Sequence, residues 1–258
     1  MTRAATLTRQ ERRQAELDGR RDAKRQRRRR AQIGRQGAPL RSLTLAAIAL
    51  GIVGVVAFAV VTAPPPLVEL NEPTTASPGQ VADGLALGAA AAPVTVDLWS
   101  DFQCPACGLF TKTMEPSLVQ DYVMPGKVRL VYHDLSFLGT ESVDAAIAAR
   151  VASQSNQFWA FHDYLFANQR GEQQGAFGQA RLEAIATTIG LDLDAFRAGQ
   201  RDPQVRQQVQ QQQSQGTAAG VAQTPTIIVG SQKFAGVPHT YADLRAAIDH
   251  ALAEAGAL

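Results

Sequence analysis

Cysteine is nearly absent from this sequence, since its 258 residues contain only Cys104 and Cys107. There is no second cysteine pair and no pair of histidines at the roughly three-to-five-residue spacing of a zinc site, so structural zinc lacks ligands. A disulfide between the two cysteines would close too short a loop to stabilise a fold by much. We predict no metal site, and the pair is either two incidental buried thiols or a redox centre.

Acidic residues are scarce in residues 1–41, which hold 14 Lys and Arg against 4 Asp and Glu, whereas the rest of the chain holds 11 against 19. This asymmetry indicates that the two segments face different surroundings. The basic run KRQRRRR at 24–30 has a composition that also suits nucleic acid. Because an apolar segment follows it, we interpret residues 1–41 as a cytoplasmic basic tail and predict no nucleic-acid partner.

Charge is missing altogether from residues 43–63, LTLAAIALGIVGVVAFAVVTA, whose only polar side chains are two threonines. As a helix this run would span about 30 Å, the thickness of a bilayer core, and it has no polar stripe. A cleaved signal peptide usually has an apolar region of only about 7–15 residues, and the prolines that follow at 64–66 disfavour cleavage. We predict a transmembrane helix over 42–63, which anchors the chain in the cell membrane by a single pass with the remainder extracytoplasmic.

Residues 64–92 lack any regular apolar period, and five prolines fall within residues 64–80. They predict a Pro/Ala-rich linker, so that the folded domain covers 93–258. Within it, the apolar β-branched run at 94–100 and the run at 127–135 predict strands. A helical insertion is expected at about 140–216, followed by a hairpin from 224 and a closing helix over 240–256. This order indicates a mixed α/β domain.

The insertion is rich in aromatic side chains, which we interpret as its core rather than as a substrate groove: Phe158, Trp159, Phe161 and Phe166. The four histidines are interpreted as surface or core residues without a catalytic role: His133, His162, His239 and His250.

The Cys-Pro-Ala-Cys stretch lies where the first strand ends and a helix begins. Cys104 then occupies the N-cap and Pro105 the first turn, where a missing N–H costs nothing. The free N–H groups and the dipole of the first turn favour a thiolate at Cys104. Cys107 lies one turn further on, within reach to form and resolve a disulfide. Such a pair suits the compartment outside the cytoplasm, where disulfides persist.

Three stretches in order resemble the DsbA-like branch of the thioredoxin superfamily: VTVDLWSDFQCPAC, QFWAFHDYLF and TPTIIVGSQKFAG. The resemblance covers about residues 90–255 and implies a thioredoxin-like fold with a helical insertion. It further implies a thiol:disulfide oxidoreductase that needs no cofactor. It also implies a cis Thr224–Pro225 bond that lies against the cysteine pair and forms the edge to which a substrate peptide binds.

The sequence departs from that branch at two positions. Ala106 stands where DsbA has a histidine that helps to stabilise the thiolate, which predicts a weaker oxidant. The position of the buried acid found in many relatives is Leu98, whereas Asp97 lies one residue earlier, on the opposite face of a strand. Asp97 is either a proton-transfer group or a hydrogen-bonded structural acid. Trp99 and Asp101 either line the site or serve in packing and capping.

The resemblance predicts that the protein oxidises cysteines of exported client proteins and is itself reoxidised by a quinone-linked membrane partner. Reduction or isomerisation of client disulfides is the alternative within the same chemistry, and the reduction potential of the pair separates the two. The alternative from another class is a non-catalytic thioredoxin-like module whose cysteines hold copper or a client. An insulin-reduction or peptide-oxidation assay separates that module from an enzyme.

Overall fold

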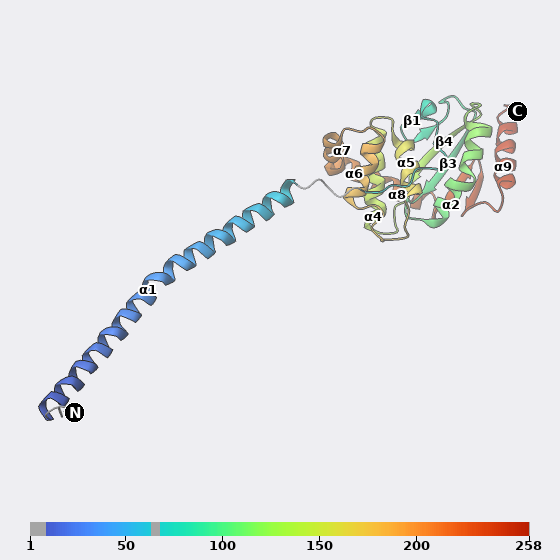
Figure 1. Cartoon of the computed structure of the whole chain (residues 1–258). Coiled ribbons are helices and arrows are strands. Elements are labelled where there is room, and N and C mark those ends of the chain that lie inside the picture. Colours follow the sequence, from blue (N-terminus) through green and yellow to red (C-terminus); the bar gives the residue numbers. More distant parts are fainter. Residues whose placement is uncertain (1–8, 63–67, 258) are drawn as a thin grey trace. The chain divides into compact units, whose positions relative to one another are not determined.

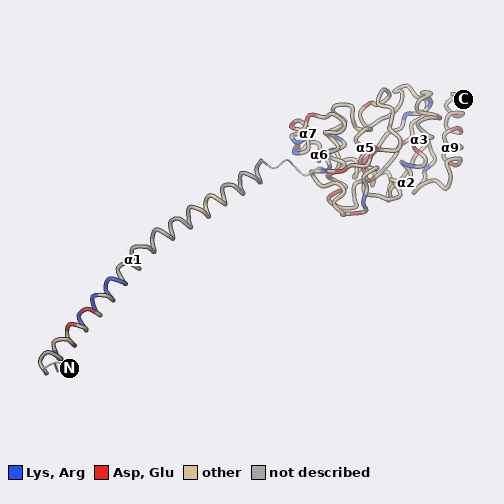
Figure 2. The backbone as a smooth tube through the Cα atoms, viewed as in Figure 1, with Lys and Arg blue, Asp and Glu red and all other residues tan. Residues whose placement is uncertain are grey.

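The computed structural model describes residues 9–62 and 68–257, which fall into two compact units, Met1–Pro66 and Leu67–Leu258 (Figure 1). In the first unit a helix, α1, runs over Arg9–Thr62, and its described Lys and Arg residues lie in its N-terminal part (Figure 2). A search of the described residues finds no helix that combines the length and apolarity needed to cross a bilayer. The predicted span at 42–63 falls largely on side chains outside the described ones.

The second unit is built on one six-stranded sheet of order β1-β2-β4-β3-β5-β6. The strands are β1 Ala82–Asp83, β2 Ala86–Leu87, β3 Val94–Ser100, β4 Val128–Asp134, β5 Thr226–Val229 and β6 Gln232–Ala235. Central β3 runs parallel to β4, whereas all other neighbours pair antiparallel. One face of β3 is buried throughout, whereas on the other face Thr95 is exposed and Asp97 is half-buried.

The helices divide between the two sides of this sheet. They are α2 Pro105–Thr113, α3 Glu115–Leu118, α4 Thr140–Ser153, α5 Phe158–Ala167, α6 Gln179–Thr188, α7 Leu193–Arg201, α8 Pro203–Ala218 and α9 Tyr241–Glu254. Helix α8 packs on β4, and α9 packs on β3 and β5 (Figure 1). The α/β class with a helical insertion is therefore confirmed.

The aromatic side chains of α5 form the core of the insertion, as predicted. Phe158, Trp159, Phe161 and Phe166 are each at most 1% exposed. On the other side of the insertion, α8 approaches the sheet at Gly216, where a Cβ atom would lie 2.7 Å from the ring of Trp99. A glycine is therefore required at this crossing, and the glutamine-rich segment is an ordered helix.

Residues 68–92 differ from the predicted linker, because they pack on the domain. A strap, residues 68–81, is tied to the insertion where the backbone N–H of Asn71 donates to Asn168 Oδ1 at 2.8 Å and that of Ser77 donates to Asp163 Oδ2 at 2.6 Å. Strands β1 and β2 then extend the sheet beside β4, with Leu87 fully buried. The sequence concealed this because the partners lie far along the chain, 86 and 97 positions away for the two strap hydrogen bonds.

We expect a chain that starts at residue 93 to be less stable than one that starts at residue 68 by about 3 kcal/mol, because it loses the buried Leu87 and the strap hydrogen bonds. Urea denaturation of the two proteins, followed by circular dichroism, measures the difference. Equal midpoints would contradict the docking of residues 68–92.

Candidate active site

The cysteine pair lies where the turn after β3 leads into α2. The backbone of Cys104 is extended and serves as the N-cap of α2, with Pro105 as the first helical residue. Its carbonyl accepts the first helical hydrogen bond, from the N–H of Gly108 at 3.1 Å, and its sulfur accepts from the N–H of Cys107 at 3.4 Å. A sulfur in this place receives the unpaired donors of the first turn.

These contacts make the two thiols unequal. The side chain of Cys107 and then that of Thr224, with backbone N–H groups of the first turn, lower the pKa of Cys104 to about 6 against the opposing effect of burial. Burial, with the neighbouring Cys104, raises the pKa of Cys107, and the side chain of Ser100 opposes it only in part. Both cysteines are buried, at 6% and 1% exposure, so ionisation rather than accessibility distinguishes them.

The prolyl loop reaches the pair through the register of the sheet. Thr226 of β5 pairs with Trp99 of β3, so the two residues before Thr226 lie beside the turn that follows β3. The Thr224–Pro225 bond is cis, as the resemblance implied, and the carbonyl oxygen of Thr224 lies 3.4 Å from Cys104 Sγ. The ionised sulfur is therefore flanked by helix donors on one side and a peptide backbone on the other.

Asp97 lies apart from this site. Its Oδ1 is 2.7 Å from Nε2 of His133, whose ring stacks on Trp99. It is paired on the face of the sheet away from the cysteines, as the alternation of a strand demands. The polar groups nearest Cys107 are instead the side chain of Ser100 and the backbone of Asp101. The geometry thus favours the structural interpretation of Asp97 over proton transfer.

Asp101 caps the active-site turn. Its buried carboxylate accepts from the N–H groups of Gln103 at 2.8 Å, Phe137 at 3.0 Å and Leu138 at 3.2 Å, and from the hydroxyl of Ser142 at 2.7 Å. Burial raises the pKa of this carboxyl, while the four donors oppose the rise. Asp101 therefore joins the turn before Cys104 to the loop after β4 and to α4.

Gln169 is a contact residue that the sequence analysis missed. It follows α5 in the insertion, and its side-chain amide donates to the carbonyls of Phe102 at 2.6 Å and Cys104 at 3.1 Å. The same amide rests on Gly108, where a Cβ atom would collide with it. The one local signal was a glycine inside an apolar helix, which indicates close approach.

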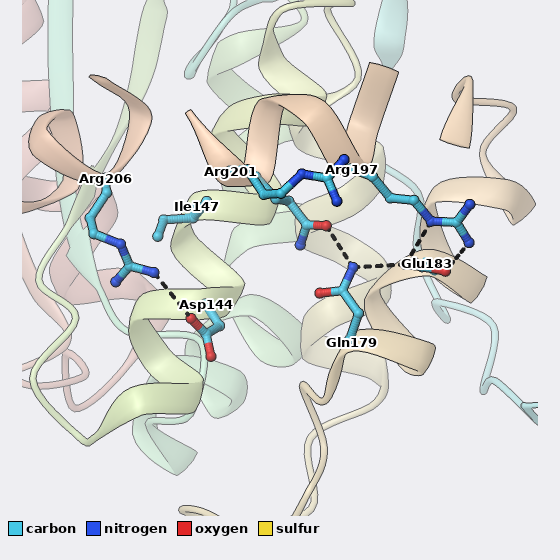
Figure 3. A pocket seen from close by; sticks show the side chains of 8 residues that line it. Asp144, Ile147, Gln179, Glu183, Arg197, Arg201 and Arg206 are labelled. Atoms are coloured by element: carbon cyan, nitrogen blue, oxygen red, sulfur yellow. Dashed lines mark hydrogen bonds and ion pairs between the residues drawn. The ribbon is translucent and has the colours of Figure 1, made fainter. Parts of the chain in front are cut away.

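A separate cavity of about 410 Å³ lies among α4, α6, α7 and α8 (Figure 3). Arg197 binds Glu183 there through two hydrogen bonds of 2.9 and 2.5 Å, and Arg206 faces Asp144 at 3.8 Å. Its lining includes no residue of β3, α2 or the prolyl loop. These arginines are engaged by acids of the insertion, and the cavity takes no part in the cysteine site.

Several known proteins are similar to this chain in sequence or in fold. A family profile described as Thioredoxin matches residues 80–250. The probable disulfide bond formation protein D of Bacillus cereus is 27% identical over 147 residues, which cover 55% of this chain and 68% of that protein. The Na⁺/H⁺ antiporter NhaA 3 of Salinispora tropica is 33% identical over 166 residues, but these cover 64% of this chain and 24% of that protein.

Among solved structures, the oxidised form of BdbD from Bacillus subtilis matches with a TM-score of 0.60 and 24% identity. The match covers 71% of this chain and 100% of that one. At this identity the likeness concerns the fold.

In the reduced chain we expect the alkylation rate of Cys104 to rise with pH through about 6 and then to level off, because only the thiolate reacts. Cys107 should react slowly throughout. Because the folded chain lowers this pKa from its ordinary value of about 8.5, the reduced protein should also lose stability as the pH falls from that value towards 6. Iodoacetamide labelling read by mass spectrometry measures the profile. A midpoint near the ordinary value would refute the arrangement.

We expect the effect of Gly108→Ala on the stability of the fold to change sign when Gln169 is replaced. In the native chain it forces the amide of Gln169 off its two carbonyls and should destabilise the fold by about 1 kcal/mol, despite the better helix propensity of alanine. In a Gln169→Ala chain the clash is gone, and the same substitution should stabilise by about 1 kcal/mol. Denaturation of the four proteins in a double-mutant cycle measures the coupling. Additive effects would show that the contact carries no energy.

Proposed function

Because the chain belongs to the thioredoxin family, we propose that it is a membrane-anchored, extracytoplasmic thiol:disulfide oxidoreductase that oxidises cysteines of exported proteins. The thiol:disulfide oxidoreductase class agrees with relatives named as disulfide bond formation proteins. The observation that carries the proposal is the thiolate-favouring environment of Cys104, whose sulfur lies at the N-cap of α2 and accepts from the N–H of Cys107 at 3.4 Å.

In the proposed reaction, a client thiolate attacks Sγ of Cys104 in the oxidised pair. The Cys104–Cys107 bond breaks, Cys107 leaves and takes a proton, and a mixed disulfide joins Cys104 to the client. A second client thiolate then attacks the client sulfur of that bond and releases Cys104 as a thiolate. The client loses two electrons and the pair gains them. A leaving group with a pKa of about 6 is a good one, which favours oxidation of the client.

The prolyl loop is proposed to bind the client as an extended strand. Thr224 and Pro225 lie at the end of β5, where the backbone of Thr224 faces the sulfur of Cys104. The N–H of Gly236 holds the carbonyl of Pro225 at 2.8 Å, which fixes the loop from behind. Contacts through the backbone would accept many client sequences. Pro105 and Ala106 tune the pair, and the absence of a polar side chain at Ala106 makes it a milder oxidant than DsbA.

The anchor is proposed from the uncharged run at 43–63 and from the apolar surface of α1. Ile48, Leu50, Ile52 and Val53 are 58–72% exposed, and such apolar surface needs a partner. The basic residues before the run place the N-terminus in the cytoplasm and the cysteine pair outside. A quinone-linked membrane protein is the proposed reoxidant.

We expect the Cys104–Cys107 pair to have a reduction potential less negative than about −200 mV, because the reduced form is stabilised by an ionised Cys104. Equilibration with glutathione buffers measures it. A value near the −270 mV or so of thioredoxin would indicate a reductase instead.

Cys107→Ser should accumulate mixed disulfides with peptide thiols, since the resolving sulfur is gone, whereas Cys104→Ser should form none. Mass spectrometry of the trapped species checks this, and the Cys104→Ser chain serves as the matched control. A wild-type chain that neither oxidises nor reduces peptides would support a non-catalytic module.

A further inference from the structure

A buried polar cluster lies between α3, α5 and the strap, and the redox reaction does not use it. It consists of Glu115, His162 and Asp163, which are 3%, 0% and 6% exposed. One oxygen or nitrogen atom from each lies within 4.8 Å of the other two. Three such groups are costly to bury unless something pairs with them.

The imidazole of His162 is aimed at Glu115 with nothing between them. Its Nδ1 lies 2.9 Å from Asp163 Oδ1, so a ring proton is assigned to Nδ1, and Nε2 faces Glu115. Nε2 is fully buried and has no hydrogen-bond partner, and Glu115 Oε2 lies 3.9 Å away. This distance is too long for a hydrogen bond. Two ligands about 2 Å from one tetrahedral zinc ion lie about 3.3 Å apart, so binding would draw these two atoms slightly together.

The remaining contacts hold both groups in position. Asp163 accepts from the N–H of Ser77 at 2.6 Å and from its hydroxyl at 3.0 Å, while Thr111 donates to Glu115 Oε2 at 3.1 Å. A carboxylate on the far nitrogen of a histidine is the usual outer partner of a metal-bound imidazole. Asp163 occupies that position here.

Around the rest of the imidazole the walls are aromatic. The ring centroids of Phe166, Trp159, Tyr132 and Phe102 lie 4.8–5.9 Å from that of His162. Two of these rings carry polar atoms of their own, Tyr132 Oη and Trp159 Nε1, which are also buried without a hydrogen-bond partner. The low polarity of the remaining wall strengthens electrostatic binding inside the cluster.

A cavity beside the cluster reaches its two carboxylates. It has a volume of about 300 Å³ and is lined by Glu115, Asp163, Thr111 and the strap residues Thr75–Pro78. There is room in it for the water ligands that would complete a coordination sphere. A second cavity, of about 280 Å³, also reaches Asp163 and Thr111.

We propose that Glu115 and His162 bind a divalent transition-metal ion such as Zn²⁺, with Asp163 orienting the imidazole and water from the cavity completing the coordination. Imidazole with carboxylate is a donor set that zinc accepts. The ion would join α3 to α5 beneath the strap. It is a site apart from the cysteine pair and does not depend on the proposed function. This proposal departs from the prediction made from the sequence, which was that the chain has no metal site.

The test uses the full chain, stripped of metal with EDTA and then oxidised, so that the sulfurs of Cys104 and Cys107 are in a disulfide and cannot bind zinc. Isothermal titration with Zn²⁺ should show one saturable site. Glu115→Gln and His162→Gln should each weaken binding at least tenfold. Glu172→Gln, the same change at an exposed acid, and His239→Gln should leave it unchanged. Circular dichroism confirms that each variant is folded.

A second measurement uses the wild-type chain alone, so it does not depend on whether a variant folds. With Co²⁺ in place of zinc, one histidine ring proton should appear at a strongly shifted position in the NMR spectrum. Absence of saturable Zn²⁺ binding by the oxidised wild-type chain would overturn the proposal. Equal binding by the folded Glu115→Gln and His162→Gln chains, or a Co²⁺ spectrum without a shifted imidazole proton, would also overturn it.

Discussion

The sulfur of Cys104 at the first turn of α2 is the contact on which the rest of this structure depends. Free N–H groups of the turn meet it from one side, and the Thr224 backbone meets it from the other. The positions of both groups are set by the sheet. Helix α2 follows the end of β3, and the prolyl loop leads into β5, which pairs with β3. The sheet therefore determines the spacing that makes one thiol of the pair acidic and the other inert.

Helix α5 connects this turn to the outside of the domain. Just beyond its end, Gln169 holds the carbonyls that precede and begin α2, and within it Asp163 receives the strap through Ser77. His162 of the same helix packs on Phe102, directly behind the active-site turn. The strap and the active-site turn thus share one helix as their support. The insertion is part of the active-site scaffold rather than a cover for it.

Prediction from the sequence succeeded where the determinant is local and failed where it is distant. The N-cap at Cys104 and the proline after it could be read from six residues, because capping involves one turn of chain. The strap looked like a linker because its prolines and alanines have no period, yet Asn71 and Ser77 find partners on α5. Asp97 attracted attention by its place in the chain, but the pleat of β3 turns it towards His133. The roles of Gln169 and Glu115 could not be foreseen, since each acts on residues more than forty positions away.

By itself, the sequence determined the α/β class, the insertion and the place of the redox pair, because periodicity, β-branching and helix capping act between neighbours in the chain. The tertiary structure decided which groups surround the two sulfurs, that residues 68–92 belong to the domain, and that three buried polar side chains meet beside a cavity. These depend on strand register and helix packing, which bring distant segments together and leave no local pattern.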